Sequence, residues 1–245
     1  MKDYDELHEL WARAHSAGSP IKYVRNLMVF KELAKLEPGK TLDAGCGTGE
    51  YSIFLAKRGH EVTAFDPSSF ALKGLMEKGG RELGITVQEN TFDGFHSNIE
   101  FDNIISIEVF EHLSDDQSAI QKCYSLLRQG GALVISVPAR PFLFSEADRI
   151  SGHYRRYLCN DFVKLLSGAG LKDIRVKSYG FPVLFLYSLV RKMFLDRLLI
   201  NYFSSSSREP KKQVTYLTSL YPYVLGLDRL NIPFGGIGYV AVCKK

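Results

Sequence analysis

A strand, a glycine-rich turn and a helix follow one another at residues 40–58, and this unit restricts the possible folds more than any other part of the sequence. The turn reads Asp43-Ala-Gly-Cys-Gly-Thr-Gly49, and a helix is expected directly after it. Glycine permits a tight turn and a close approach of the backbone to a ligand. The N-terminus of the following helix presents unpaired N–H groups to an anion. The unit therefore predicts a ligand-binding loop at the end of a buried strand.

Strands and helices alternate along the chain after this unit, with short connections. Further strands are expected at 61–65, 85–88, 101–107, 132–137, 171–178 and 238–243, and helices at 68–78, 115–127 and 160–167. This alternation predicts an α/β fold of the Rossmann-like, doubly wound type, in which helices cover both faces of a mostly parallel sheet. Ligands bind such sheets beyond the carboxyl ends of the strands, so functional side chains are expected there.

The spacing of the glycines does not fit the dinucleotide fingerprint G-x-G-x-x-G. Counted from Gly45, the third position of that fingerprint is Glu50, and counted from Gly47 it is Ser52. Asp43, at the mouth of the loop, would repel a pyrophosphate but could hold a cationic amine. An NAD(P)-dependent oxidoreductase of the Rossmann type is therefore kept as an alternative only.

The loop resembles that of the class I methyltransferases, which use S-adenosylmethionine and act in part on small molecules and quinones. The pattern D-x-G-x-G-x-G begins at Asp43, and Asp66 ends the second strand at the matching place. The resemblance implies a seven-stranded sheet, mostly parallel with an antiparallel edge strand, and S-adenosylmethionine as cofactor. A partner protein that binds this cofactor without catalysis is a further alternative.

The resemblance also implies which residues bind the cofactor. The loop faces its methionine part, Asp66 accepts hydrogen bonds from the ribose hydroxyls, and Asn90-Thr91 lies where the family places a polar or acidic residue against the adenine. Asn at position 90 departs from the Asp that is commoner there. The full set of expected cofactor contacts is Asp43, Gly45, Cys46, Gly47, Gly49, Asp66, Pro67, Asn90, Thr91 and Glu108.

The fourth strand ends in an E-x-x-E-H pattern that starts at Glu108. Many small-molecule methyltransferases carry a similar segment. The sequence has neither the Asn/Asp-Pro-Pro-aromatic motif nor the Pro-Cys nucleophile of enzymes that methylate nucleic-acid bases. A small-molecule or lipid-like acceptor is therefore expected rather than nucleic acid.

Methyl transfer to a hydroxyl requires that the hydroxyl proton leaves, and histidine is suited to take it. His112, in the E-x-x-E-H pattern, and His153, in the loop after the fifth strand, are the candidate bases. Both loops should project from the same edge of the sheet. O-methylation is therefore expected, with N- or C-methylation as the other possibilities.

A metal site is a sharper hypothesis for the same residues. Glu108, Glu111, His112 and His153 offer oxygen and nitrogen ligands for Mg, Mn or Zn. Metal-assisted O-methyltransferases of quinone biosynthesis and small-RNA 3′-end methyltransferases have a similar pattern. A bound metal would acidify the acceptor hydroxyl. In the alternative, Glu108 contacts the cofactor, and Glu111 and His112 cap the following helix.

Two adjacent arginines stand between tyrosines at 154–157. Arg155 and Arg156, with Tyr154, could bind a carboxylate or phosphate of the acceptor. Alternatively, the two arginines pair with acidic neighbours and fix the loop. The neighbours considered for this pairing are Glu146, Asp148 and Asp161.

The chain is expected to have three parts: a helical extension at 1–39, a cofactor-binding domain at 40–178 with 237–245, and an apolar, basic insertion at 179–236. The formal net charge of +4 is concentrated near this insertion, since residues 176–212 contain seven basic and two acidic side chains. Apolar and basic residues together favour an anionic lipid surface. The insertion is predicted to cover the substrate site, or to contact a membrane through 179–212 or a partner protein. A cytoplasmic location is expected because no signal peptide is recognisable.

Overall fold

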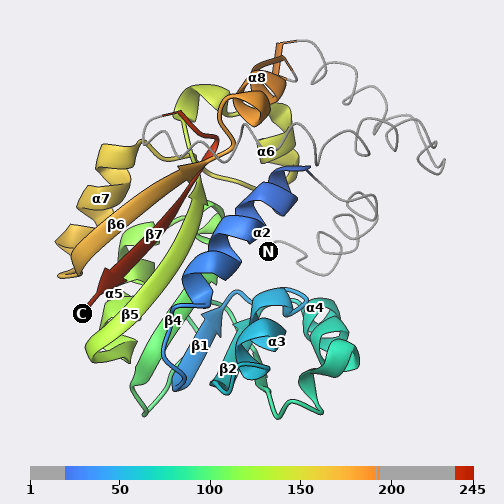
Figure 1. Cartoon of the computed structure of the whole chain (residues 1–245), viewed down its shortest axis with the longest axis vertical. Helices are drawn as coiled ribbons and strands as arrows, with labels where there is room; N and C mark the ends of the chain where they lie inside the picture. Colours follow the sequence, from blue (N-terminus) through green and yellow to red (C-terminus); the bar gives the residue numbers. More distant parts are fainter. Residues whose placement is uncertain (1–19, 191, 194–234) are drawn as a thin grey trace.

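A seven-stranded sheet lies at the centre of the computed structural model, which describes residues 20–190, 192–193 and 235–245 (Figure 1). The strands are β1 (Lys40–Ala44), β2 (Glu61–Asp66), β3 (Thr86–Glu89), β4 (Phe101–Ile107), β5 (Leu127–Pro138), β6 (Lys172–Tyr179) and β7 (Gly238–Lys244). Their order across the sheet is β3-β2-β1-β4-β5-β7-β6. β7 runs antiparallel to β5 and β6, and the other pairs are parallel. The predicted fold class is confirmed.

Helices cover both faces of the sheet because the strands are apolar on both faces. In β4, Ile104 belongs to one hydrophobic cluster and its neighbour Ile105 to the other. The helices α5 (Asp116–Leu126) and α7 (Cys159–Gly168) pack on the first face, and α2 (Pro20–Leu33), α3 (Glu50–Ala56) and α4 (Ser69–Leu75) pack on the second. Buried side chains on successive strand residues are typical of a parallel sheet between two helical layers.

Helix α2 shows that part of the predicted N-terminal extension contributes to the core. Val29 and Leu33 of this helix are completely buried. Nζ of Lys177 in β6 lies 2.7 Å from Oε1 of Glu32, and this ion pair links the helix to the edge strand β6. Of the helical extension expected at 1–39, residues 20–33 form α2, and residues 1–19 lie outside the described residues.

Two further element boundaries differ from the sequence-based expectation by three residues or more. The helix expected at 68–78 is α-helical only to Leu75, and the wider π turn Met76–Gly80 follows, in which Gly79 has a φ of 114°. β5 begins at Leu127 rather than at 132, because Leu127 pairs with Phe101 of β4 through a shift in register. Neither difference moves the carboxyl ends of the strands.

The carboxyl ends of β1 and β4 form the point where the strand order reverses. β1 pairs with β2 on one side and with β4 on the other, so the chain leaves β1 and β4 toward opposite faces of the sheet. The short helices η2 (Phe110–His112), η3 (Pro141–Leu143) and α6 (Glu146–Ile150) follow β4 and β5 at this edge. The predicted functional loops thus share one edge.

The predicted insertion is described only at its beginning and end. Helix α8 (Val183–Val190) starts after Pro182, and Lys192 and Met193 follow it. The remainder of the proposed lid or membrane segment, to residue 212, lies outside the described residues. Within the described part of the chain, every helix is too short or too polar to span a bilayer.

Candidate active site

The glycine loop after β1 has the backbone conformation that its sequence predicts. Gly45, Gly47 and Gly49 have φ values of 78°, 52° and 76°, a region that residues with a Cβ atom rarely adopt. A Cβ atom on Gly45 would lie 2.6 Å from Cγ2 of Val109, and one on Gly49 would lie 2.2 Å from Cγ of Leu75. Glycine is therefore required at these positions by conformation and by space.

Asp66 at the end of β2 is linked directly to this loop. Its Oδ2 accepts a hydrogen bond from the backbone N–H of Gly47 at 2.8 Å, and its Oδ1 accepts one from Ser68 N–H at 2.9 Å. The backbone N–H of Asn90, at the end of β3, donates to the carbonyl of Asp66 at 3.1 Å. The structure thus brings together the loop, Asp66 and Asn90, three of the features predicted to hold the cofactor.

Asp43 is buried below the loop, with 1% of its surface exposed. The hydroxyl of Ser52 donates a hydrogen bond to Oδ2 of Asp43 at 2.6 Å. Burial raises the pKa of Asp43 to about 7; the hydrogen bond from Ser52 opposes this rise, and the nearby charge of Asp66 adds to it. The carboxyl group can therefore change its charge near neutral pH, when a cationic ligand approaches.

The remaining predicted cofactor residues lie around the same loop. Burial raises the pKa of the Cys46 thiol, so this side chain is neutral. Thr91 is exposed, and its Oγ1 accepts a hydrogen bond from Gly94 N–H at 3.1 Å. Pro67 is partly exposed between Asp66 and Ser68. The individual contacts of these residues with a cofactor stay predictions.

Glu108, directly after β4, has a φ of 57°. A non-glycine residue in the left-handed region stores strain, and such residues are common at functional sites. Its Oε1 accepts hydrogen bonds from the hydroxyls of Ser136 and Tyr179, the latter at 3.4 Å. Its Oε2 lies 3.3 Å from Nη1 of Arg25. Four distant parts of the chain therefore meet at this carboxylate.

Arg25 is a candidate site residue that the sequence analysis missed. Its side chain is 16% exposed, and its Nε has no hydrogen-bond partner among the described residues. Burial by itself would lower the pKa of Arg25, but the charge of Glu108 and the Tyr51 and Tyr179 side chains raise it above its ordinary value, so the group is always charged. Its spacing in the sequence could have revealed it. Arg25 lies one helical turn before the buried Val29, so its side chain is on the face of α2 that packs on the sheet.

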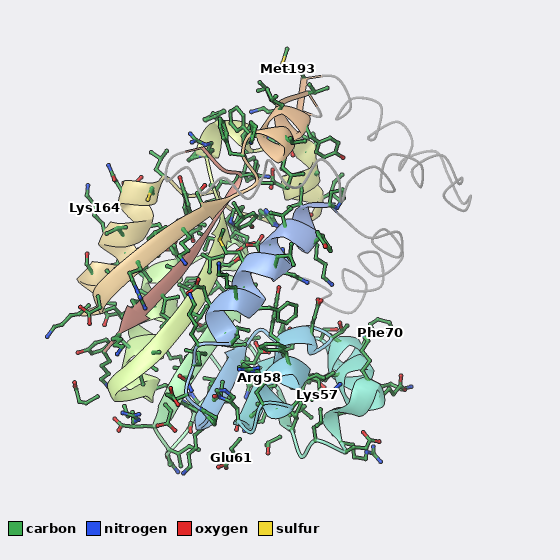
Figure 2. The ribbon with its side chains drawn as sticks, in the orientation of Figure 1. Lys57, Arg58, Glu61, Phe70, Lys164 and Met193 are labelled. Carbon is green, nitrogen blue, oxygen red and sulfur yellow. The ribbon has the colours of Figure 1, made fainter. Side chains whose placement is uncertain are left out.

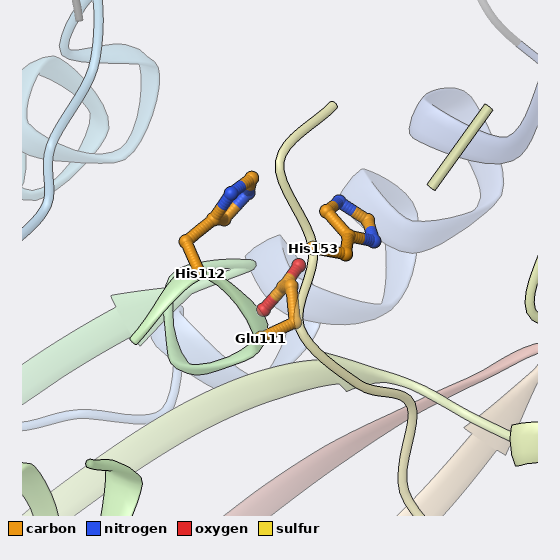
Figure 3. Close-up of side chains that lie close together, drawn as sticks. All are labelled: Glu111, His112 and His153. Carbon is orange, nitrogen blue, oxygen red and sulfur yellow. The ribbon is translucent and has the colours of Figure 1, made fainter. Parts of the chain in front are cut away.

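Glu111, His112 and His153 form a cluster at the ends of β4 and β5 (Figure 3). One ligand atom from each residue lies within 4.8 Å of the others. The two imidazole rings are perpendicular, with centroids 4.6 Å apart. The expectation that both loops project from the same edge is confirmed, and the two candidate bases are neighbours.

Glu111 is completely buried, and both of its carboxyl oxygens lack a hydrogen-bond partner among the described residues. Burial raises the pKa of Glu111 well above its usual range, and the charge of Glu108 raises it further. An orphaned buried carboxyl group is costly and indicates a missing ligand or proton. Glu111 was also considered as a cap of the following helix. That helix, α5, is capped by the side chain of Asp115 instead.

The structure corrects the predicted metal set in one respect. Glu108 is not part of the cluster of Glu111, His112 and His153, because its carboxylate is bonded to Arg25 and Ser136. A site built from the described residues would therefore have three protein ligands instead of four. The open position of a three-ligand site is the arrangement that leaves room for a substrate oxygen.

The two arginines after His153 are engaged within the protein. Nη1 of Arg155 lies 2.8 Å from Oδ1 of Asp116, and Nη2 of Arg156 lies 2.7 Å from Oδ1 of Asp148. The predicted pairing of an arginine with Asp148 is thus observed, whereas Asp116 was not among the partners considered. Both arginines also line an open cavity of about 450 Å³ between α5 and α7. Tyr154 is 53% exposed. An acceptor-binding role for these residues stays a prediction.

Comparison with known proteins supports the architecture of this site. The model of a family described as "Methyltransferase domain" matches residues 21–184. The ubiquinone biosynthesis O-methyltransferase of Azotobacter vinelandii is 29% identical over 141 residues, which cover 54% of this chain and 60% of that protein. The protein of the same name from Actinobacillus pleuropneumoniae is 36% identical over 147 residues, covering 56% of this chain and 62% of that protein.

A solved structure shows the same fold. The phosphoethanolamine N-methyltransferase 2 of Haemonchus contortus, in complex with S-adenosyl-L-methionine, superimposes with a TM-score of 0.61 at 19% identity. The match covers 90% of this chain and 52% of that one. The family match favours the predicted methyltransferase over the NAD(P) oxidoreductase. The chain belongs to the methyltransferase-domain family, and its fold is that of the class I S-adenosylmethionine-dependent methyltransferases.

Proposed function

We propose that the chain transfers the methyl group of S-adenosylmethionine to a hydroxyl group of a small-molecule or lipid-like acceptor. The observation that carries this proposal is the contact between the glycine loop and the segment of the histidine cluster. Gly45 packs against Val109, so closely that a Cβ atom there would lie 2.6 Å from Cγ2 of Val109. Val109 stands two residues before Glu111, so a methyl donor on the loop and a proton acceptor on His112 or His153 would be neighbours.

The charges of the residues around the loop support the proposed cofactor. Asp43 and the loop would face the methionine part, Asp66 would bind the ribose, and Asn90-Thr91 would lie against the adenine. The guanidinium of Arg25, with its Nε unpartnered among the described residues, supplies a donor for the cofactor's carboxylate. The cationic ammonium and sulfonium groups would favour ionised Asp43, whose pKa of about 7 lets it lose its proton at little cost.

The chemistry that the bound cofactor supplies is an electrophilic methyl group. The task of the protein is to hold the acceptor oxygen in line with it and to exclude water. His112 or His153 takes the proton of the hydroxyl as the oxygen becomes the nucleophile. The ubiquinone biosynthesis O-methyltransferases to which this chain is similar are named for transfer to oxygen, which supports a hydroxyl acceptor here.

A divalent metal at Glu111, His112 and His153 is a second candidate for activating the hydroxyl. The orphaned carboxyl oxygens of Glu111 and the spacing of the three ligand atoms, all within 4.8 Å, fit such an ion. Mixed oxygen and nitrogen donors suit Mn or Zn better than Mg. The ion would lower the pKa of the acceptor hydroxyl, so that a weaker base would suffice to remove its proton.

The test is methyl transfer to hydroxylated phenols, with and without a prenyl chain, by the wild-type protein and by His112→Gln and His153→Gln. We expect transfer to oxygen, and a reduction of kcat by roughly 10²-fold in the variant that has lost the base. Binding of S-adenosylhomocysteine, measured by calorimetry, should change little in either variant. His96→Gln, outside the cluster, is the matched control.

The same assay, repeated after chelation and after return of Mn or Zn, separates base from metal. Loss and recovery of turnover would favour the metal, and unchanged turnover would exclude it. Transfer only to nitrogen or carbon would contradict the hydroxyl assignment. Binding of NADH in place of S-adenosylhomocysteine would contradict the proposed cofactor.

We also propose that α8 and its neighbours contact a membrane surface that presents a lipid-like acceptor. The side chains of Phe142, Ile150, Leu186, Val190 and Met193 are each at least half exposed. They lie on η3, on α6 and on or just after α8 at one end of the molecule, where Figure 2 shows Met193 pointing outward. Exposed apolar side chains, together with the basic residues that follow α8 in the sequence, favour an anionic lipid interface.

Flotation with vesicles of phosphatidylglycerol and phosphatidylcholine tests this surface. The wild-type protein should float with the vesicles, and Leu186→Asp with Met193→Asp should reduce the bound fraction several-fold by removing apolar area and adding negative charge. Phe70→Asp is the matched control, since Phe70 is 41% exposed on α4, away from α8. Equal flotation of the two variants, or none by the wild type, would contradict the proposal.

A further inference from the structure

The carboxylate of Asp148 accepts hydrogen bonds on both of its oxygens. Asp148 lies in the first turn of α6 and is 3% exposed. Its Oδ2 accepts from the backbone N–H of Ser145 at 2.7 Å and from the hydroxyl of Ser145 at 3.0 Å. Its Oδ1 accepts from Nε of Arg156 at 3.1 Å and from Nη2 at 2.7 Å. The carboxylate is therefore held rigidly by the helix start and by one arginine.

His153 is a further partner of the same oxygen. Its Nδ1 lies 3.0 Å from Oδ1 of Asp148, and its side chain is 11% exposed. Burial by itself would raise the pKa of Asp148, but hydrogen bonds from His153 and the charge of Arg156 lower it below its ordinary value. An ionised carboxylate has no proton to donate, so Nδ1 of His153 must be the donor. In the neutral ring the lone pair is then on Nε2.

We propose that Asp148 is a positioning residue for His153, which fixes the orientation of the ring and the proton on Nδ1 so that Nε2 is the nitrogen that acts on the acceptor. This inference rests on the proposed function and names His153, rather than His112, as the base. The choice follows from the bond of its ring to a carboxylate whose two oxygens also accept hydrogen bonds from Ser145 and Arg156. A carboxylate that orients a catalytic histidine in this way determines which nitrogen can accept a proton.

In the proposed step the acceptor hydroxyl loses its proton to His153 and gains the methyl group. The hydroxyl proton of the acceptor moves to Nε2 of His153, and the oxygen lone pair forms the new O–C bond. The electrons of the broken C–S bond stay on sulfur, which becomes the neutral thioether of S-adenosylhomocysteine. The imidazolium then returns one proton to water, while the Nδ1 proton stays on the bond to Asp148.

The test moves the proton of the His153 ring from Nδ1 to Nε2 by substitutions that change the size of the side chains little. In Arg156→Met, Asp148 loses the arginine but keeps Ser145 and His153. Adding Asp148→Asn then gives a side chain whose carbonyl must accept from Ser145 N–H, so that its NH₂ group points at His153. Nδ1 of His153 must now accept, and its proton moves to Nε2. Because the arginine is removed together with the carboxylate, this double variant avoids a buried cation without a partner.

Two readouts apply to the wild-type protein, Arg156→Met and the double variant. Long-range ¹H–¹⁵N spectra report the tautomer of His153, which is assigned among the six histidines by its loss in His153→Gln. We expect Nδ1–H in the wild type and in Arg156→Met, and Nε2–H in the double variant. We expect kcat to be roughly 10²-fold lower in the double variant than in Arg156→Met, which serves as the reference for any effect of the arginine itself, and we expect the two variants to differ little in the KM of the acceptor.

Each outcome bears on one of the two proposals. Nε2–H in the wild type, or an unchanged tautomer in the double variant, would overturn the positioning role, as would an equal loss of kcat in Arg156→Met alone. If the tautomer shifts as expected but His153→Gln keeps full kcat, Asp148 holds a histidine that is not the base, and the proposed role of His153 fails. Thermal unfolding of all variants shows whether they fold.

Discussion

Replacing Asp43 with Asn should stabilise the protein at neutral pH and weaken its binding of S-adenosylhomocysteine. The pKa of Asp43 is raised by burial to about 7, whereas an aspartate of the unfolded chain ionises near its ordinary value. Between these two pKa values only the unfolded state loses the proton, so this carboxyl group lowers the stability as the pH rises, and the loss is complete above the folded-state pKa. Each unit of difference corresponds to about 1.4 kcal/mol.

The amide side chain introduced by Asp43→Asn has no proton to lose, so this loss of stability disappears in the variant. We expect Asp43→Asn to exceed the wild type in free energy of unfolding by about 4 kcal/mol near pH 7.5, and by less than half of that near pH 5. Urea unfolding at several pH values measures the difference. The affinity for S-adenosylhomocysteine should fall about tenfold or more, because the variant loses the carboxylate that we propose faces the methionine part of the cofactor.

A matched aspartate in the same sheet should behave in the opposite way. Asp102 accepts hydrogen bonds from Nε of Arg128 at 2.5 Å and from Lys40 N–H at 2.8 Å, and these bonds lower its pKa. Asp102→Asn should therefore reduce stability at neutral pH, and this reduction should shrink as the pH falls. It should not alter cofactor binding. Equal pH profiles for the wild type and Asp43→Asn would contradict the role given to burial.

Replacing Gly45 with Ala should destabilise the protein and abolish measurable binding of S-adenosylhomocysteine. The φ of 78° is unfavourable for alanine, and the new Cβ atom would lie 2.6 Å from Cγ2 of Val109. The conformational cost alone is about 1–2 kcal/mol, and with the steric clash we expect a total loss of about 3 kcal/mol or more. Urea unfolding and calorimetry measure the two effects.

Gly59 separates the two causes. Its φ is 87°, but a Cβ atom there would meet nothing within 4 Å. Gly59→Ala should therefore show the conformational cost alone, about 1 kcal/mol, with normal cofactor binding. The double variant Gly45→Ala with Val109→Ala removes the clash. Its loss of stability should therefore be as small as that of Gly59→Ala. If Gly45→Ala costs no more than Gly59→Ala, the loop is not held by Val109.

The sequence allowed the sheet and the cofactor loop to be predicted because both depend on local signals. Alternating apolar strands and helices indicate a parallel sheet, and Gly45, Gly47 and Gly49 occupy positions whose positive φ favours glycine. An antiparallel strand near the edge of the sheet was implied by the family resemblance alone. Its place between β5 and β6 could not be predicted, because no local pattern in a strand reports its neighbours.

Most members of the candidate site were predictable, with Arg25 as the exception, but the contacts between them were not. His112 and His153 were expected at one edge, and their rings lie 4.6 Å apart. That Glu108 bonds to Arg25 and Ser136 could not be read from spacing, because these residues are brought together only when the strands and α2 pack. Asp148 was considered as a partner of the arginines, but its bond to His153 depends on the turn at Gly152, which has a φ of 75°.

Because four segments meet at Glu108, substitutions at these positions are expected to depend on one another. The side chains of Arg25 on α2, Ser136 on β5 and Tyr179 on β6 all contact the carboxylate of Glu108 at the end of β4. A change at any one of them leaves a charge or hydroxyl unpaired, so single substitutions are penalised while joint ones can be tolerated. The match of the family model from residue 21 onward includes this arginine. The region that the family model matches therefore includes α2 from its second residue, ahead of β1 and the glycine loop.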